Sequence, residues 1–248
     1  MKKTVIMTRG ALSGLLIAGA VATGAGAQVN DAGGQPGRME KPAWVVGDVP
    51  DTVWILMETA VATPDEERMK ELLLESEDPA RTAVVGNEDN VGRRFALAAV
   101  LGMRADREGG RTKVKAAAAL HDELKVVLEL DAEHAQAHYM MGRLHAGVRR
   151  MNGVVRWLAT NLLGGDTLKQ ASWEEAERHL TFAAANAPEV PDHHLQLARV
   201  YRDTGRPEMA LPVLDHVLSM DVTSPMEREA RAEALQIQAE IYADFSSH

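Results

Sequence analysis

The segment from Trp173 to Val217 reads WEEAERHLTFAAANAPEVPDHHLQLARVYRDTGRPEMALPVLDHV, and its small and large apolar residues recur at a fixed spacing. Three positions return 34 residues later: Ala176, Leu180 and Ala183 recur as Ala210, Leu214 and Val217. Within each copy these residues stand three or four apart, which indicates α-helix. A period of this length is typical of stacked units that bury their apolar faces only against a neighbour. The segment therefore predicts helical hairpins packed side by side.

A further copy lies upstream and is interrupted by an insertion. Met141, Gly142 and His145 of this copy correspond to Leu197, Ala198 and Tyr201. The two sets are 56 residues apart, which equals one period of 34 residues plus an insertion of 22. We place the insertion at about residues 148–170. Small residues at Gly142, Ala176 and Ala210 allow neighbouring helices to approach each other closely.

The rest of the chain from Asp51 onward also shows helical periodicity. We expect helices over Thr52–Ala62, from a cap at Thr63–Glu66 through Leu74, over Phe95–Ala105, over Lys115–Leu130, and over Ser224–Phe245 as a closing element. The predicted fold class is all-α, a solenoid of about four helical hairpins with an inserted amphipathic helix. It forms one domain over residues 49–248, with its best-defined repeats within 113–245.

The small–large–small spacing, closed by a proline-type turn, resembles the tetratricopeptide repeat. The links at Asp131–His134 and Ala187–Glu189 stand where that family breaks between helix pairs. The resemblance implies that the first helices of the pairs line a concave surface on which extended peptides bind.

Longer runs of the sequence resemble the family called regulators of microtubule dynamics, which carries the same insertion within a repeat. These runs are Gly109–Val114, Leu130–Asp131, Ala137–Arg143, Trp157–Ala159, Leu163–Gly165, Ala171–Ala176, and His194 with Leu197–Tyr201. The resemblance implies a microtubule-associated regulator, while the bacterial members of the family resemble exported repeat proteins of unassigned role.

The amino-terminal residues predict export. A basic start at Met1–Lys3 and Arg9 precedes an apolar stretch over Ala11–Ala22, and Ala25–Ala27 then provides the small-x-small pattern of a signal-peptidase site. The apolar stretch falls short of the ~20 residues that span a bilayer, although an uncleaved anchor remains the alternative. We expect a signal peptide over 1–27, cleavage after Ala27, a flexible leader over 28–48 and a periplasmic location.

Composition excludes several classes of protein. The 248 residues contain no cysteine, which excludes disulfide scaffolds, thiolate metal sites and cysteine nucleophiles. The formal net charge is −9, and the loss of Lys2, Lys3 and Arg9 with the signal peptide makes it −12. Because nucleic acids are bound largely through Lys and Arg, this surplus of acid argues against a nucleic-acid partner.

The tetratricopeptide pattern places five residues of two successive repeats on the concave surface: Tyr139, Arg143, Leu195, Arg199 and Arg202. Guanidinium groups that converge on a groove can bind a carboxylate or a phosphate bidentately. We therefore predict a partner-binding site in which the three arginines hold an anionic group and Tyr139 and Leu195 form an apolar floor. The alternative is that the arginines pair with local acids such as Asp203.

The insertion carries an apolar stripe over Met151–Leu163, flanked by Arg149, Arg150 and Arg156. Basic and apolar residues together favour contact with an anionic membrane surface. The commoner outcome for an amphipathic helix is that its stripe packs against the rest of the protein, and we expect this second arrangement.

No catalytic, metal or cofactor site is predicted. His134, His138 and His145 lie close in sequence, but His138 and His194 occupy the same repeat position, and His145 occupies that of Tyr201. We therefore interpret these histidines as structural. Neither a nucleophile elbow nor a His-Glu-x-x-His motif is present, and the run over Gly109–Lys113 lacks the frame of a phosphate-binding loop.

Three functions remain open. The first is a non-catalytic adaptor whose concave surface binds a peptide or a partner protein that carries an acidic group. The second is a carrier or sensor of a lipid or small anionic ligand, which an enclosed apolar cavity beneath Trp157 would favour over a shallow groove. The third is the microtubule-associated role that the family resemblance implies.

Overall fold

The structure is a computed structural model that describes residues 48–246. The predicted signal peptide and all of the predicted leader except Asp48 lie outside the described residues. Residues 48–246 form α-helices and one short 3-10 helix, with no strand: α1 (Asp51–Ala62), α2 (Glu66–Val84), α3 (Val91–Arg107), α4 (Gly110–Leu130), α5 (Ala135–Arg150), α6 (Gly153–Leu162), η1 (Asp166–Gln170), α7 (Trp173–Asn186), α8 (Pro191–Asp203), α9 (Pro207–Ser219) and α10 (Pro225–Ser246).

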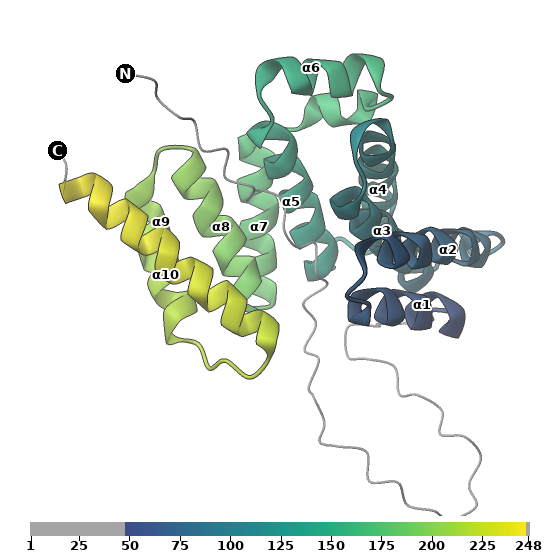
Figure 1. Ribbon diagram of the computed structural model, residues 1–248, viewed down its shortest axis with the longest axis horizontal. Helices are drawn as coiled ribbons and strands as arrows, with labels where there is room; N and C mark the ends of the chain where they lie inside the picture. Colours follow the sequence, from purple (N-terminus) through teal and green to yellow (C-terminus); the bar gives the residue numbers. More distant parts are fainter. Residues whose placement is uncertain (1–47, 247–248) are drawn as a thin grey trace, which may run out of the picture.

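The helices pack as hairpins that follow one another across the molecule (Figure 1). The hairpins are α1 with α2, α3 with α4, α5 with α7, and α8 with α9. Successive hairpins touch through α2 and α3, α4 and α5, and α7 and α8, and α10 closes the stack against α8 and α9. This arrangement confirms the predicted all-α solenoid with an insertion between the two helices of one hairpin.

The 34-residue period corresponds to equivalent buried positions in α7 and α9. All six of its residues are fully buried: Ala176, Leu180 and Ala183 in α7, and Ala210, Leu214 and Val217 in α9. Each helix thus buries one stripe against its hairpin partner and its neighbour in the stack. The spacing seen in the sequence therefore reflects packing rather than composition alone.

Gly142 allows α5 to lie unusually close to α7. A Cβ atom at this position would stand 2.6 Å from the Cγ atom of Leu180 and 3.1 Å from the carbonyl oxygen of Ala176. Real Cβ atoms essentially never approach another heavy atom as closely as the first of these distances. The hairpin that spans the insertion is therefore closed at a separation that only glycine permits.

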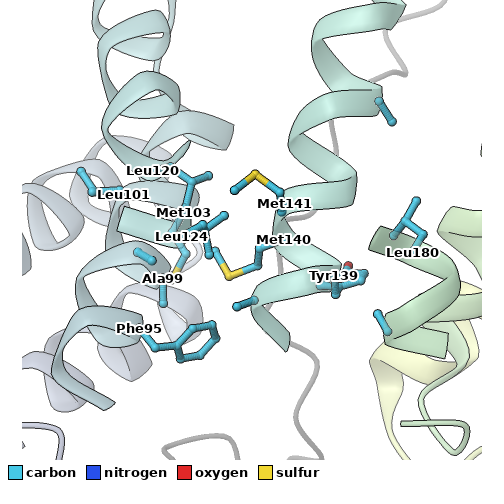
Figure 2. Packing of buried hydrophobic residues seen from close by; sticks show 14 of the residues in the cluster. Phe95, Ala99, Leu101, Met103, Leu120, Leu124, Tyr139, Met140, Met141 and Leu180 are labelled. Atoms are coloured by element: carbon cyan, nitrogen blue, oxygen red, sulfur yellow. The ribbon is translucent and has the colours of Figure 1, made fainter. Parts of the chain in front are cut away.

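Helix α5 contacts hairpins on both of its sides. Three consecutive residues, Tyr139, Met140 and Met141, are all buried. Figure 2 shows the two methionines directed towards the α3–α4 hairpin, where Leu120 and Leu124 lie, and Tyr139 directed the other way, towards α7. Consecutive helical residues point about 100° apart, so a run of buried residues means that α5 is covered on more than one face.

Three helix boundaries differ from the sequence prediction by four residues or more, and one of them is the start of α3, at Val91 rather than at Phe95. Helix α2 continues past Leu74 to Val84, because Ser76, Ala80 and Val84 extend the buried stripe at four-residue spacing despite Pro79 within the helix. Helix α4 begins at Gly110 rather than at Lys115. The cap of α2 is Asp65, whose side chain accepts a hydrogen bond from the backbone N–H of Arg68 at 2.7 Å.

The inserted helix α6 turns its large apolar residues to solvent. Val154 is 72% exposed and Trp157 is 57% exposed, whereas the buried residues of α6 are Ala159 and Thr160. The expectation that this stripe packs against the stack is therefore wrong. The segments at either end of α6 hold it in place through a small cluster with α4 and α5 that includes Met151, Leu163, Val114 and Val148.

We expect replacement of Gly142 by alanine to destabilise the fold by about 1–3 kcal/mol, because the added methyl group overlaps Leu180 and the backbone of α7. Gly147 lies in the same helix with open space around its Cα atom, so Gly147→Ala is the matched control and should be neutral or stabilising by up to about 1 kcal/mol. Urea unfolding of both variants measures the difference. Equal effects of the two substitutions would contradict close packing at Gly142.

Candidate functional site

A groove of about 1310 Å³ runs between successive hairpins and α10. Its walls come from the end of α3, the start of α4, α5, η1, α8 and α10. Apolar side chains from most of these elements line it, among them Val114, Leu120, Leu144, Val148, Leu195 and Ile237. We call this space the groove.

The groove carries equal numbers of cationic and anionic side chains. The cations that line it are Arg107, Lys113, Arg143, Arg150, Arg199 and Arg202. The acids that line it are Asp106, Asp192, Asp203, Glu229, Glu233 and Glu240. In a chain with a formal net charge of −9, the groove is thus less acidic than the molecule as a whole.

Four of the five residues predicted for the partner site line the groove: Arg143, Leu195, Arg199 and Arg202. Tyr139 does not line it, and Tyr139 and Leu195 are each only 1% exposed. The structure therefore places Tyr139 beneath the surface, where it supports the groove, rather than on the apolar floor that the sequence predicted.

Tyr139 and Arg143 belong to a polar network that joins three helices. The Tyr139 hydroxyl donates a hydrogen bond to the carboxylate of Asp192 in α8, and Arg143 Nη1 donates to the Tyr139 oxygen at 3.1 Å. Arg143 Nη2 also lies 4.0 Å from an oxygen of Asp106 in α3. Burial raises the pKa of Tyr139, which keeps the hydroxyl protonated as a donor. With its side chain 11% exposed, Arg143 is mainly a structural link between Asp106 and Tyr139.

Arg199 and Arg202 lie nearer the solvent and contact acids of α10. Arg199 Nε donates to Glu233 at 2.6 Å, and its Nη1 donates to Gln196 at 3.1 Å. Arg202 Nη1 lies 3.5 Å from Glu240, and Nη2 donates to Asp203 at 3.2 Å. The pairing of arginine with local acids, which the sequence left as an alternative, is thus present.

Sequence reasoning missed the two α10 acids in this arrangement. Glu233 and Glu240 stand seven residues apart, so they share one face of α10, and that spacing was the available signal. All four side chains of the two pairs remain between 22% and 51% exposed. Ion pairs that are open to water are weak, so each of these pairs contributes little to the stability of the fold.

His138, which the repeat pattern predicts to be structural, is held by hydrogen bonds together with His179. Arg178 donates to His179 Nε2 at 2.7 Å, His179 contacts His138 through their Nδ1 atoms at 2.8 Å, and His138 Nε2 reaches the Ala132 carbonyl at 3.0 Å. Because arginine only donates and a carbonyl only accepts, His179 must donate its Nδ1 proton to His138. Both rings are therefore satisfied in their neutral forms.

The repeat equivalence of His138 and His194 is also visible in their contacts. His194 Nε2 lies 3.0 Å from the Pro188 carbonyl, and His138 makes the same contact to the carbonyl six residues before it. Each ring thus fastens a helix to the link that precedes it. Among residues 48–246 there is no group of three or more histidine or acidic side chains placed to hold a metal ion.

The buried histidines predict acid sensitivity. Burial lowers the pKa of His145 to about 4 and that of His179 to about 3. Since an unfolded histidine has a pKa near ~6.5, the unfolded chain binds more protons below that pH, and the free energy of unfolding falls as the pH drops from there towards the folded values. We expect a loss of more than about 1 kcal/mol between about pH 7 and about pH 4, measured by chemical unfolding.

The substitution His145→Asn tests this assignment, because the asparagine oxygen can still accept the hydrogen bond that Ser172 N–H donates to His145 Nδ1 at 3.3 Å. The variant should show a flatter pH profile of stability, while His216→Asn, at an exposed position, should keep the original slope. Identical slopes for both variants would show that His145 does not contribute to the acid sensitivity.

Comparison with known proteins identifies the family. The sequence matches the family described as regulator of microtubule dynamics protein 1-3 over residues 53–242. The match runs from α1 to α10 and includes the insertion and both walls of the groove. A search of curated proteins finds no match. The family match covers most of the chain, and the protein therefore belongs to the regulator of microtubule dynamics protein 1-3 family.

Proposed function

We propose that this protein is a non-catalytic adaptor that captures a peptide segment of a partner protein in the groove. The observation that carries the proposal is the partly exposed pairing of Arg199 and Arg202 with acids of α10 along a groove of about 1310 Å³. Pockets for small molecules hold about 300–1,000 Å³, so this space suits a longer occupant. Apolar side chains and arginines in one recess are typical of protein interfaces.

The α10 acids explain how a partner enters. Glu233 and Glu240 occupy the guanidinium groups that a partner's carboxylates would bind. A partner's carboxylate that replaces Glu233 or Glu240 makes the same kind of ion pair that it breaks. The affinity of the partner therefore comes from contacts with apolar side chains of the groove, and its selectivity comes from acids spaced to match Arg199 and Arg202. The proposed partner segment therefore combines acidic residues with apolar residues that contact Leu144 and Met151, which line the groove and are partly exposed.

The hairpins are, in this proposal, repeats of the tetratricopeptide type. The support is the 34-residue period, whose equivalent residues in α7 and α9 are fully buried. The sequence of residues 1–27 supports export and a periplasmic partner. Finding the mature amino terminus at Gln28 in a periplasmic fraction tests that location.

A microtubule is the second candidate partner, and family membership is the observation that favours it. Purified microtubules are therefore one probe in the experiment below. A lipid carrier is less favoured. An enclosed apolar cavity beneath Trp157 would support it, whereas Trp157 is 57% exposed and does not line the groove.

We expect an adduct with a partner when a photoreactive amino acid replaces Gln236, which lines the groove, but not when it replaces Leu235. The two positions are adjacent on α10 and point in different directions, so they sample different faces of one helix. Crosslinking in cells, followed by mass spectrometry of the adduct, is the measurement. Equal adducts from both positions would overturn the groove assignment.

The double variant Arg199→Glu/Arg202→Glu should lose this adduct by about tenfold or more, because each substitution repels a partner's carboxylates. Arg228→Glu/Arg231→Glu is the matched control, since both residues are exposed, lie outside the groove and give the same change in net charge. Circular dichroism checks that both variants remain folded. Co-sedimentation of the same variants with microtubules shows whether that polymer is the partner.

Glu233→Gln/Glu240→Gln should have the opposite effect and raise the yield of the adduct, because it removes the acids that compete inside the protein. Exposed ion pairs contribute about 0–1 kcal/mol each, so the melting temperature should change little. A lower yield with unchanged stability would show that these acids bind the partner rather than compete with it.

A further inference from the structure

Helix α6 is turned with its apolar side outwards. Five large apolar side chains of this ten-residue helix are exposed: Val154, Val155, Trp157, Leu158 and Leu162. The side that faces the stack carries Arg156, Ala159 and Thr160 instead. Figure 1 shows α6 lying across one end of the stack, beside the ends of α4 and α5.

Specific contacts fix this rotation. Arg156 Nη1 donates to the carbonyl oxygens of Arg149 at 3.2 Å and of Met151 at 3.0 Å, so the one cation within α6 caps the end of α5. After the carboxyl end of α6, the Gly165 N–H donates a hydrogen bond to the Ala159 carbonyl oxygen at 3.1 Å, and a Cβ atom at Gly165 would stand 2.8 Å from that oxygen. The apolar side is thus held outwards by hydrogen bonds and close packing.

The surroundings of α6 are cationic in an acidic protein. Residues 107–115 and 149–169 together contain eight basic side chains (Lys and Arg) and two acidic ones (Asp and Glu). The whole chain, in contrast, has 27 basic and 36 acidic side chains. A Cβ atom at Gly164, just after α6, would stand 3.9 Å from the Cγ atom of Lys115, so the start of α4 adjoins this helix. Arg111, Lys115 and Lys169 are exposed.

We propose that α6 docks this protein on an anionic lipid surface. Its apolar side chains enter the boundary between headgroups and acyl chains, and the exposed Arg111, Lys115 and Lys169 bind the anionic headgroups. Trp157 is of the residue type that is enriched at this boundary. Helix α6 is too short to cross a bilayer, and within residues 48–246 no helix is long and apolar enough to do so, so α6 lies in the plane of the surface.

Charge decides between a lipid surface and a second copy of the chain. Pairing two copies through α6 would bring two cationic surroundings together, and like charges disfavour that association. An anionic bilayer is complementary to the same surface. Met151 lines the groove and adjoins α6, so docking also sets the groove beside the membrane.

Flotation of the full-length chain with vesicles tests the proposal. The vesicles are phosphatidylcholine alone or phosphatidylcholine with phosphatidylglycerol, and we expect binding to the second kind with a blue shift of tryptophan emission that Trp157→Phe removes. Val154→Glu should weaken binding by about tenfold or more, while Val85→Glu, at a position that is also 72% exposed but follows α2, should not.

All variants share residues 1–47, so any difference between them arises from the substituted side chains. Arg111→Gln/Lys115→Gln should reduce binding to the anionic vesicles by about tenfold or more, because each cation near the surface contributes about 1 kcal/mol. Equal binding of the Val154 and Val85 variants, or binding with no change in Trp157 emission, overturns the proposal. Sedimentation that shows a dimer broken by Val154→Glu assigns the face to a second copy and also overturns it.

Discussion

The close approach of α5 and α7 at Gly142 is the constraint on which the rest of the structure depends. It joins two halves of a hairpin across the inserted residues, so the insertion must leave the stack at its end and α6 must lie outside it. The same contact sets α5 between its neighbours, with Met140 and Met141 on one side and Tyr139 on the other. Tyr139 and Arg143 then reach Asp192 and Asp106, which ties the groove walls of α3, α5 and α8 together.

The groove combines a buried polar network at its base with ion pairs that are more exposed. Arg143 is nearly buried and bridges helices, so its loss would remove both the hydrogen bond to Tyr139 and the ion pair with Asp106. Arg199 and Arg202 are more exposed and share their charge with α10. This division separates residues that hold the walls from residues that the proposed partner contacts. Helix α10 is the end cap of the solenoid and, in the proposed function, it carries the acids that compete with the partner.

Much of the architecture was predictable because packing imposes it on the sequence. The period between Ala176 and Ala210, and the small residue at Gly142, indicated stacked hairpins before any coordinates. The arginines of the groove followed from the same register. The contacts of α10 could not be predicted in this way. The angle at which the last helix crosses its neighbours depends on how its side chains fit, and the repeat pattern carries no information on that fit, so Glu233 and Glu240 were missed. The outward rotation of α6 was missed for a related reason: a stripe shows that a helix is amphipathic, whereas the contacts of Arg156 determine which side meets the protein.

A double-mutant cycle between Gly142 and Leu180 tests the central contact most directly. If the 2.6 Å approach is the constraint, the free-energy cost of adding a methyl group at Gly142 should largely disappear in a Leu180→Ala background, because the overlapping side chain has been removed. The measured quantity is the coupling free energy from urea unfolding of the four proteins. Strong coupling supports the account, whereas equal costs in both backgrounds would show that α5 and α7 do not meet at these residues.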